Sequence, residues 1–523
     1  MSPRRQDVNA SKAVPHPASA NLFDLIAARA ADKPGKLALD TGDAFALTYG
    51  GLIERSGRAA NALRSLGVEP GDRVAAQVEK SPDAIVLALA CLRAGAALLP
   101  LNTAYTAAEL DYFLGDAQPA LTLCRPELVH PVRELADKHG LPAVESLGAA
   151  RDGTFAGKIA AAPKEFETIP RATDDLAAIL YTSGTTGRSK GAMLTHENLS
   201  SNALTLVDYW RFTADDRLIH ALPVFHTHGL FVAVNVALIA GATMIFQNRF
   251  DPDAVTAALP RATALMGVPT FYTRLLDHPG LTREVCRTVR LFVSGSAPLL
   301  AETHAQWRER TGFAILERYG MTETNMIASN PYDGERRAGT VGFPLPGVGV
   351  RIGEAESGRP VAAGEIGVIE VKGPNVFRGY WRMPEKTAQE FRPDGFFITG
   401  DLGRVDADGY IHIVGRAKDL VISGGFNVYP KEVEAEIDAI EGVQESAVIG
   451  VPHPDFGEGV TAVVVPRPGA DLTEAAILAA LGGRLAKFKA PKRVFVVEAL
   501  PRNAMGKVQK AALRAAYKDI YRG

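Results

Sequence analysis

The chain has few cysteines, little net charge and no long apolar run. Its 523 residues include only three cysteines, which lie far apart and have neither the density of a disulfide framework nor the spacing of metal ligands. A formal net charge of -2 gives no overall attraction to nucleic acid or to an anionic membrane. No apolar segment reaches the length of a membrane span, and the N-terminus lacks the apolar core of a secretory signal. We therefore expect a cytoplasmic protein without nucleic-acid or membrane partners, in which residues 1–20 are disordered or foreign to the fold.

What the chain does contain is a loop suited to a polyphosphate, Tyr181-Thr-Ser-Gly-Thr-Thr-Gly-Arg-Ser-Lys-Gly191. Its glycines let backbone N–H groups turn toward anionic oxygens, its hydroxyls add donors, and Lys190 adds a positive charge. The Walker pattern of kinases and GTPases differs, because there the lysine follows the second glycine directly, whereas Arg-Ser separates Gly187 from Lys190. A strand predicted at 177–181 and a helix predicted from residue 196 flank the loop, which argues against a flexible linker.

The order of strands and helices predicts two domains of unequal size. From residue 21 to about 415, short β-branched runs alternate with helical ones, as in a layered α/β fold, and glycine-punctuated strands at 364–372 and 409–414 predict a small β-rich unit at its end. A new pattern then follows: a helix at 429–438, strands at 445–451 and 459–466, a helix at 473–485, a strand at 493–497 and a helix from Lys510. We expect an N-terminal domain at 21–415, a hinge at 416–419 and a mobile α+β C-terminal lid at 420–523.

Six further clusters accompany the loop: Ser294-Gly-Ser-Ala-Pro298, Glu317-Arg-Tyr-Gly-Met-Thr-Glu323, Thr399-Gly-Asp401, Gly415-Arg-Ala-Lys-Asp419, Ser423-Gly-Gly-Phe-Asn-Val-Tyr-Pro430 and Pro501-Arg-Asn-Ala-Met-Gly-Lys507. Each is weak alone, because Tyr319 could be a core residue, Asp401 a helix cap and Lys507 a solvated cation. In this order, over residues 21–523, they closely resemble the acyl- and aryl-CoA synthetases of the adenylate-forming superfamily. The resemblance implies ATP, Mg²⁺ and coenzyme A as cofactors, and an acyl-adenylate that is converted to a thioester.

That chemistry explains why such a site needs fixed positive charge. A carboxylate is a poor electrophile, since its charge repels a nucleophile, and attack on the α-phosphate of ATP exchanges the charge for a good leaving group, AMP. Pyrophosphate leaves in the first step. The charge that develops must be stabilised by positive groups and a metal.

The resemblance also implies a role for each matching residue. Lys507 would bridge the carboxylate and the α-phosphate, Glu323 would bind Mg²⁺, and Thr322 would contact the α-phosphate. Tyr319 would stack on adenine and Asp401 would accept the ribose hydroxyls. The full set expected to bind ATP or AMP is Thr182, Ser183, Gly184, Thr185, Thr186, Gly187, Lys190, Ser296, Ala297, Pro298, Glu317, Arg318, Tyr319, Gly320, Met321, Thr322, Asp401 and Arg416.

Lys507 belongs to the small domain, so it reaches the site only when that domain is closed. In the family this domain rotates about a hinge, matched here by Lys418, to admit coenzyme A; Gly424 and Gly425 would suit close approach of its pantetheine arm. A solvated loop position for Lys507 and an ordinary linker charge for Lys418 are the alternatives. In related synthetases the residue matching Lys507 is a regulatory acetylation site, which implies a lysine acetyltransferase and deacetylase as partners.

The acid pocket is most similar to that of malonyl-CoA synthetases, on the segments 226–231, 267–276 and 290–298. His226 would lie beside the reacting carboxylate. Arg274 would pair the second carboxylate of malonate, Ser296 would assist it, and Thr227 and Met321 would limit substitution at the middle carbon. Because an unpaired buried charge costs about 3 to 5 kcal/mol and a methylene only about 1 to 3, acetate or butyrate should be rejected more strongly than methylmalonate.

Several alternatives stay open at this point. Arg274 could be a surface cation that pairs with Asp277, and Arg249 and Arg290 are competing positive groups. The two histidines of His226-Thr-His228 could suggest a metal, but in a strand they would alternate faces, and no third ligand is evident. The rival functions are a short- or medium-chain fatty acyl-CoA or aryl-CoA synthetase, an adenylation enzyme that loads a carrier protein, and a non-enzymatic nucleotide-binding regulator.

Overall fold

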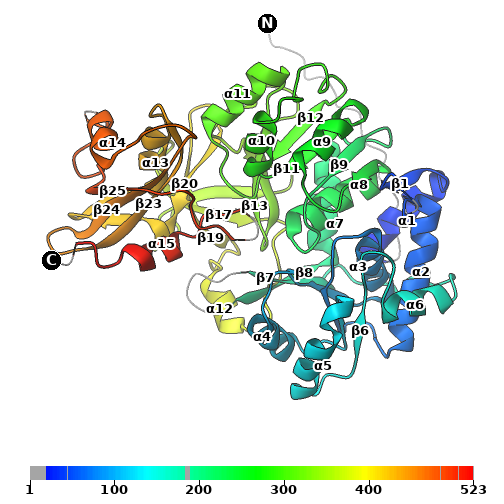
Figure 1. The fold of residues 1–523 in the computed structure, drawn as a ribbon. Helices are drawn as coiled ribbons and strands as arrows, with labels where there is room; N and C mark the ends of the chain where they lie inside the picture. Colours follow the sequence, from blue (N-terminus) through cyan, green and yellow to red (C-terminus); the bar gives the residue numbers. More distant parts are fainter. Residues whose placement is uncertain (1–18, 44, 183–188, 483, 504–505, 522–523) are drawn as a thin grey trace, which may run out of the picture.

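The computed structural model describes residues 19–521 except residues 44, 183–188, 483 and 504–505. A large body and a smaller C-terminal unit lie side by side, which confirms the predicted fold class (Figure 1). The expectation for residues 1–20 falls almost wholly outside the described residues.

Two large sheets form the body. The first has the order β15 (Phe343–Pro344), β14 (Asn325–Ser329), β13 (Leu316–Met321), β12 (Leu291–Ser294), β11 (Ala264–Gly267), β9 (Arg217–His220), β10 (Thr243–Phe246), β1 (Leu37–Asp40), β2 (Leu47–Thr48). The second has the order β18 (Gly379–Tyr380), β8 (Lys190–Thr195), β7 (Leu176–Thr182), β4 (Ala97–Pro100), β3 (Arg73–Gln77), β5 (Leu121–Cys124), β6 (Val144–Ser146). The central strands of both sheets are parallel and almost wholly apolar, as expected where helices cover both faces.

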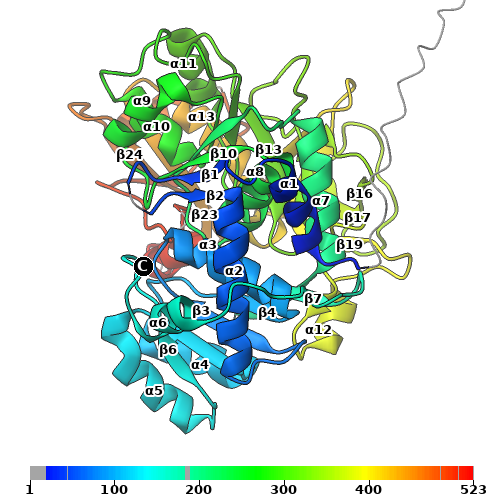
Figure 2. The same ribbon diagram turned by 90° about the vertical axis from the view of Figure 1, so that its right-hand side faces the viewer.

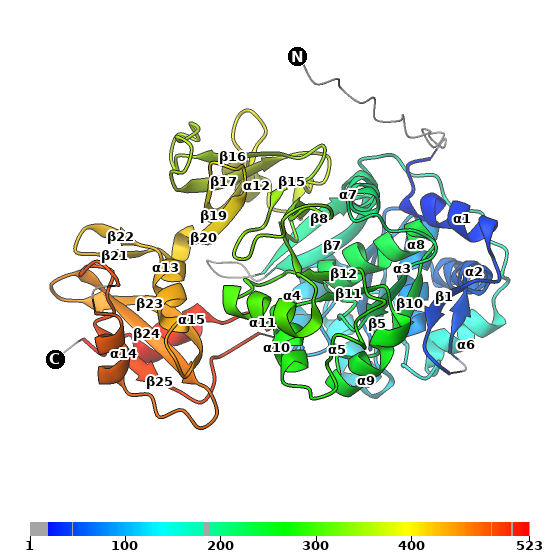
Figure 3. The same ribbon diagram turned by 90° about the horizontal axis from the view of Figure 1, so that it is seen from above.

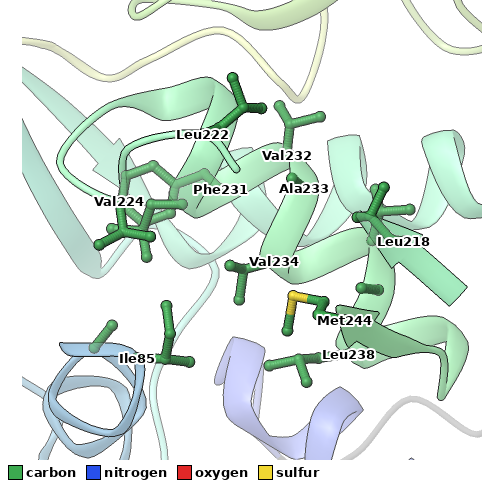
Figure 4. Close-up of a cluster of buried hydrophobic side chains, with 14 of the residues drawn as sticks. Ile85, Leu218, Leu222, Val224, Phe231, Val232, Ala233, Val234, Leu238 and Met244 are labelled. Atoms are coloured by element: carbon green, nitrogen blue, oxygen red, sulfur yellow. The ribbon is translucent and has the colours of Figure 1, made fainter. Parts of the chain in front are cut away.

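Helices pack between and around these sheets (Figure 2). The body helices are α1 (Leu22–Asp32), α2 (Tyr49–Ser65), α3 (Pro82–Ala94), α4 (Ala107–Ala117), α5 (Val129–Lys138), α6 (Thr154–Ala161), α7 (His196–Tyr209), α8 (Asn235–Ala240), α9 (Pro252–Ala258), α10 (Pro269–Leu276), α11 (Ala301–Thr311) and α12 (Pro384–Gln389). Helix α3 is buried along its whole length, and most of its residues are apolar. Its Ile85 lies near Val234, Leu238 and Met244 in a cluster that joins the two sheets (Figure 4).

A four-stranded antiparallel sheet, β16 (Gly349–Gly353), β17 (Gly367–Lys372), β19 (Phe397–Val405) and β20 (Ile411–Arg416), is the predicted β-rich unit. After β20 a short 3₁₀ turn, Ala417–Asp419, leads to a separate sheet of β22 (Phe426–Val428), β21 (Val421–Ser423), β24 (Gly457–Pro466), β23 (Val443–His453) and β25 (Arg493–Val496). Helices α13 (Pro430–Asp438), α14 (Glu474–Ala480) and α15 (Lys510–Tyr517) accompany it. Helix α14 ends five residues before the predicted 485, because the chain turns at Leu481 to Gly482.

Two structural features are relevant to the cellular compartment. Cys91, Cys124 and Cys286 are all buried free thiols. Within the described part of the chain, no helix combines the length and apolar character that crossing a membrane requires.

Candidate active site

The candidate site lies at the carboxyl ends of four neighbouring strands, β13, β12, β11 and β9. The predicted segments at 317–323, 294–298 and 267–276 begin within β13, β12 and β11, and the segment at 226–231 follows β9 after a short turn. Parallel strands bring their carboxyl ends to one edge of a sheet, where ligands of open α/β sheets bind. Segments up to ninety residues apart in sequence therefore meet because of the strand order.

The predicted phosphate loop connects β7 to β8. Ser183, Gly184, Thr185, Thr186 and Gly187 lie outside the described residues. The two ends of the loop are held together, since Thr182 pairs with Lys190 in the antiparallel ladder. Lys190 Nζ lies 2.8 Å from Glu390 Oε1 and 3.9 Å from the centre of the Tyr380 ring.

Glu323 lies in the tight turn between β13 and β14, next to Thr322, and is 5% exposed. Burial raises the pKa of its carboxyl, while hydrogen bonds to its own backbone and to Tyr380 oppose that shift. The Tyr380 hydroxyl lies 3.0 Å from Glu323 Oε1. Tyr380 therefore contacts both Glu323, the residue expected to bind Mg²⁺, and Lys190.

Tyr319, Asp401 and Arg416 form a connected row across β13, β19 and β20. The Tyr319 hydroxyl donates to Asp401 Oδ2, and Arg416 Nε lies 2.7 Å from Asp401 Oδ1. Burial and the Asp401 carboxylate raise the pKa of Tyr319. All three residues are expected to bind the nucleotide. Arg416, expected as the first residue of the hinge, is the last residue of strand β20.

The acid pocket expected around His226 has a different local structure from the one predicted. His226 and His228 do not alternate along a strand; they lie in a turn that enters a π-helical segment, His228–Val234. This correction has a physical cause at Gly229, where any Cβ would overlap the Pro223 carbonyl, so the chain must coil tightly there. The backbone N–H of His228 donates to His226 Nδ1 at 3.4 Å, and Ser296 Oγ lies 3.3 Å from His228 Nδ1. Burial, with the cations of Lys507 and Arg318, lowers the pKa of His226 to about 3, so its imidazole is neutral at physiological pH.

The burial of Arg318 is the feature that the sequence does not indicate. Arg318 is expected only among the nucleotide contacts, and its side chain is 3% exposed with its guanidinium against Gly295. Its Nε and Nη2 atoms have no hydrogen-bond partner among the described residues. Burial lowers the pKa of Arg318 to about 9, and its charge acts on His226 and His228. The adjacent Glu317 points away on the alternate face of β13, and burial raises its pKa to about 8.

The other predicted arginines occupy more exposed or already paired positions. Arg290 is committed to Asp216, with Nη2 2.7 Å from Oδ2, which removes it as a candidate. Arg274 on α10 and Arg249 are exposed and form no ion pair with any described residue, so Arg274 is neither buried nor paired with Asp277. Arg274 is thus an exposed side chain, and its expected contact with malonate stays a prediction.

The segment between β25 and α15, called here the Lys507 loop, extends from the C-terminal unit toward α10 of the body (Figure 3). A Cβ on Gly506 would lie 3.6 Å from Thr270 Oγ1 at the start of α10, so the loop contacts the body. Lys507 keeps solvent contact, but enough protein surrounds its ammonium that desolvation, together with Arg416, lowers its pKa; Asp401 and Glu323 act in the opposite direction. Arg467 and Glu302 add an ion pair of 2.7 Å between the two units.

The remaining predicted positions lie along the same edge or in the C-terminal unit. Thr227 is buried, Met321 and Ala297 are partly buried, and Gly320 approaches the Asn325 backbone too closely for a side chain. Pro298 is exposed. In the C-terminal unit Lys418 is exposed in the 3₁₀ turn, and Gly424 and Gly425 are exposed with positive φ angles of 59° and 82°.

Comparison with known proteins identifies the class. The model of the AMP-binding enzyme family matches residues 26–381, and the model of the AMP-binding enzyme C-terminal domain matches residues 432–507. The chain therefore belongs to the AMP-binding enzyme family, and the resemblance to adenylate-forming synthetases is confirmed.

Individual relatives cover nearly the whole chain. The crystal structure of ATP-bound MatB from Rhodopseudomonas palustris is 62% identical, covers 96% of this chain and 100% of that one, and has a TM-score of 0.94. A feruloyl-CoA synthase of an Amycolatopsis species is 40% identical over 476 residues, 90% of this chain and 94% of that protein. A malonate–CoA ligase of Arabidopsis thaliana is 34% identical over 499 residues, 88% of this chain and 81% of that protein.

Proposed function

We propose that this enzyme joins malonate to coenzyme A at the expense of ATP, through a malonyl-adenylate, releasing pyrophosphate and AMP. The observation that carries the proposal is the buried guanidinium of Arg318, which has unpaired donors beside the His226 to His228 turn. A buried cation without a partner calls for an anion that arrives with the ligand. A dicarboxylic acid supplies one in the carboxylate that does not react.

Arg274 fits the same proposal from the entrance of the pocket. On α10 it follows Thr270 by four residues, so both side chains share one helix face. Because Thr270 borders Gly506 of the Lys507 loop, Arg274 faces the region that the loop covers. Ser296, with its φ of 70°, and Thr227, whose buried hydroxyl has no described partner, complete the proposed acid pocket.

The proposed catalytic roles follow from charge and position. Lys507 stabilises the carboxylate and the α-phosphate as they approach, since its ammonium can interact with both. His226, with its pKa lowered, borders the acid as a neutral imidazole. Asp401 accepts the ribose hydroxyls and Tyr319 contacts the adenine, while Lys190 binds the β- and γ-phosphates.

A magnesium ion fits the residues present. Glu323 offers a buried carboxylate whose burial disfavours the charged form, a state that a bound cation reverses. Mg²⁺ is commonly held by one or two carboxylates together with nucleotide phosphates, so a single glutamate suffices. When bound, the ion would neutralise charge on the phosphates of ATP.

An aryl-CoA synthetase is the second candidate, because the feruloyl-CoA synthase is more similar in sequence than the malonate–CoA ligase. The two candidates differ in the pocket: an aromatic acid has no second charge with which to pair Arg318. The carrier-protein and fatty-acyl alternatives lack a supporting observation of this kind.

Pyrophosphate release measured with acetate, butyrate, malonate, methylmalonate, benzoate and ferulate, each with and without coenzyme A, tests the proposal. We expect the highest kcat/KM for malonate, methylmalonate next, and thioester only when coenzyme A is present. A preference for benzoate or ferulate over malonate would establish the aryl alternative instead.

Domain motion and regulation belong to the same proposal. The hinge at Lys418 and the coenzyme A path over Gly424 and Gly425 rest on the family resemblance and on the exposure of these residues. The action of a lysine acetyltransferase and deacetylase on Lys507 rests on the family resemblance. Residence in the reducing cytosol rests on the three free thiols.

A further inference from the structure

Glu390 directly follows α12 and is the acceptor at the centre of a small polar network. Its Oε1 lies 2.8 Å from Lys190 Nζ and 3.0 Å from Lys386 Nζ. Its Oε2 accepts a hydrogen bond of 2.6 Å from the Tyr380 hydroxyl. The side chains of Lys190 and Glu390 are only 15% and 20% exposed. This pair is therefore shielded more than an ordinary surface salt bridge, and its geometry is fixed by several contacts.

The backbone explains why these groups meet. Strand β18 pairs with β8, with Tyr380 opposite Ala192. Lys190 precedes Ala192 by two residues and therefore projects on the same face of β8, where its ammonium lies over the Tyr380 ring. Glu390, at the C-terminal end of α12, lies beside the same ammonium.

Tyr380 extends the network to the metal side of the site. Its hydroxyl lies between two carboxylates, 2.6 Å from Glu390 Oε2 and 3.0 Å from Glu323 Oε1. A hydroxyl has one proton, so the orientation of Tyr380 depends on both carboxylates. Tyr380 belongs to neither motif. It connects Lys190, the cation proposed to bind phosphate, with Glu323, the carboxylate proposed to bind the metal.

We infer that Glu390 is a positioning residue: it holds the Lys190 ammonium in place before MgATP binds, leaving the other ammonium hydrogens for phosphate oxygens. A lysine has large rotamer entropy, and fixing it in advance lowers the cost of ordering it on the nucleotide. The inference rests on the proposed function only in assigning Lys190 and Glu323 to MgATP; it does not depend on which acid is used.

The test is the KM for MgATP in malonate-dependent pyrophosphate release. Glu390→Ala should raise this KM about tenfold, the effect of losing one hydrogen bond to a charged group, and leave the KM for malonate unchanged. Glu390→Gln, which keeps an acceptor oxygen, should show a smaller rise, and it also serves if the alanine variant is unstable in thermal denaturation. Glu385→Ala, on the exposed side of α12, is the matched control and should behave as wild type.

The decisive arm repeats Glu390→Ala in a Lys190→Ala background. If Glu390 acts through Lys190, the second substitution adds no further rise in the KM for MgATP. An additional rise there, or an unchanged or lowered KM in the single variant, overturns the inference. If wild type prefers another acid, the proposed function fails while the same measurements, made with that acid, still decide the role of Glu390.

Discussion

Replacing Arg318 with methionine tests the substrate proposal through one side chain. Arg318 projects from β13 against Gly295, is 3% exposed, and has two guanidinium nitrogens without described partners. Methionine keeps an unbranched stem that reaches about as far as Nε, and it has neither charge nor donors. The substitution therefore removes the guanidinium while keeping most of the packing of the stem.

The magnitude follows from the cost of an unpaired charge. If the second carboxylate of malonate pairs with Arg318, its burial without that partner costs about 3 to 5 kcal/mol, or roughly one hundredfold to a few thousandfold in kcat/KM. Butyrate has no second charge, so its kcat/KM should be unchanged or improved in the variant. Specificity should shift toward the monocarboxylate.

Stability should move in the opposite direction from activity. A buried guanidinium without partners opposes folding, so the ligand-free Arg318→Met variant should have a Tm equal to or above that of wild type. An arginine with only a structural role would give a lower Tm instead.

The assay is steady-state pyrophosphate release with malonate and with butyrate, together with thermal denaturation of the ligand-free protein. Unchanged malonate kinetics would refute the pairing of Arg318 with the acid. An equal loss with both acids would point to a nucleotide role, and a large drop in Tm to a structural one.

Three further predictions follow from the same geometry. Lys507→Ala should abolish malonyl-adenylate formation but spare thioester formation from supplied malonyl-adenylate; equal loss of both half-reactions, measured separately, contradicts its assignment. Lys418→Pro should retain pyrophosphate release and lose acylation of coenzyme A, so an unimpaired overall reaction would rule out the hinge. Glu317→Gln should gain stability relative to wild type as pH rises from about 5 to 8: the native carboxyl, with its pKa raised to about 8, keeps a proton that the unfolded chain releases, so wild type loses stability over that interval. A difference in Tm that does not change with pH would contradict this.

Much of the fold could be predicted because its signals are local. The buried helix α3, the strand β7 before the phosphate loop, and the C-terminal order of α13, β23, β24, β25 and α15 follow from hydrophobic periodicity and glycine positions. The π-helical turn at His228–Val234 could not be predicted in this way, because it depends on the close packing of Gly229 against the nearby Pro223 carbonyl, a contact that hydrophobic periodicity does not reveal.

The residues of the candidate site also differ in how far a local sequence signal identifies them. Lys190, Glu323, Asp401 and Lys507 stand in short motifs, so their residue types identify them. Burial cannot be read from a motif: Arg274 is exposed although the sequence suggested a buried partner for malonate, and Arg318 is buried within a motif assigned to the nucleotide.

By itself, then, the sequence determined the class of chemistry, because a phosphate loop and the motifs around it require particular residue types at fixed spacings. The tertiary structure decided which cations are available to a substrate. Arg290 is neutralised by Asp216, Lys190 is held by Glu390, and Arg318 alone among these three is buried without a described partner. Pairing and burial depend on strand order and helix packing, which bring residues from distant segments into contact, and no local pattern in the chain encodes them.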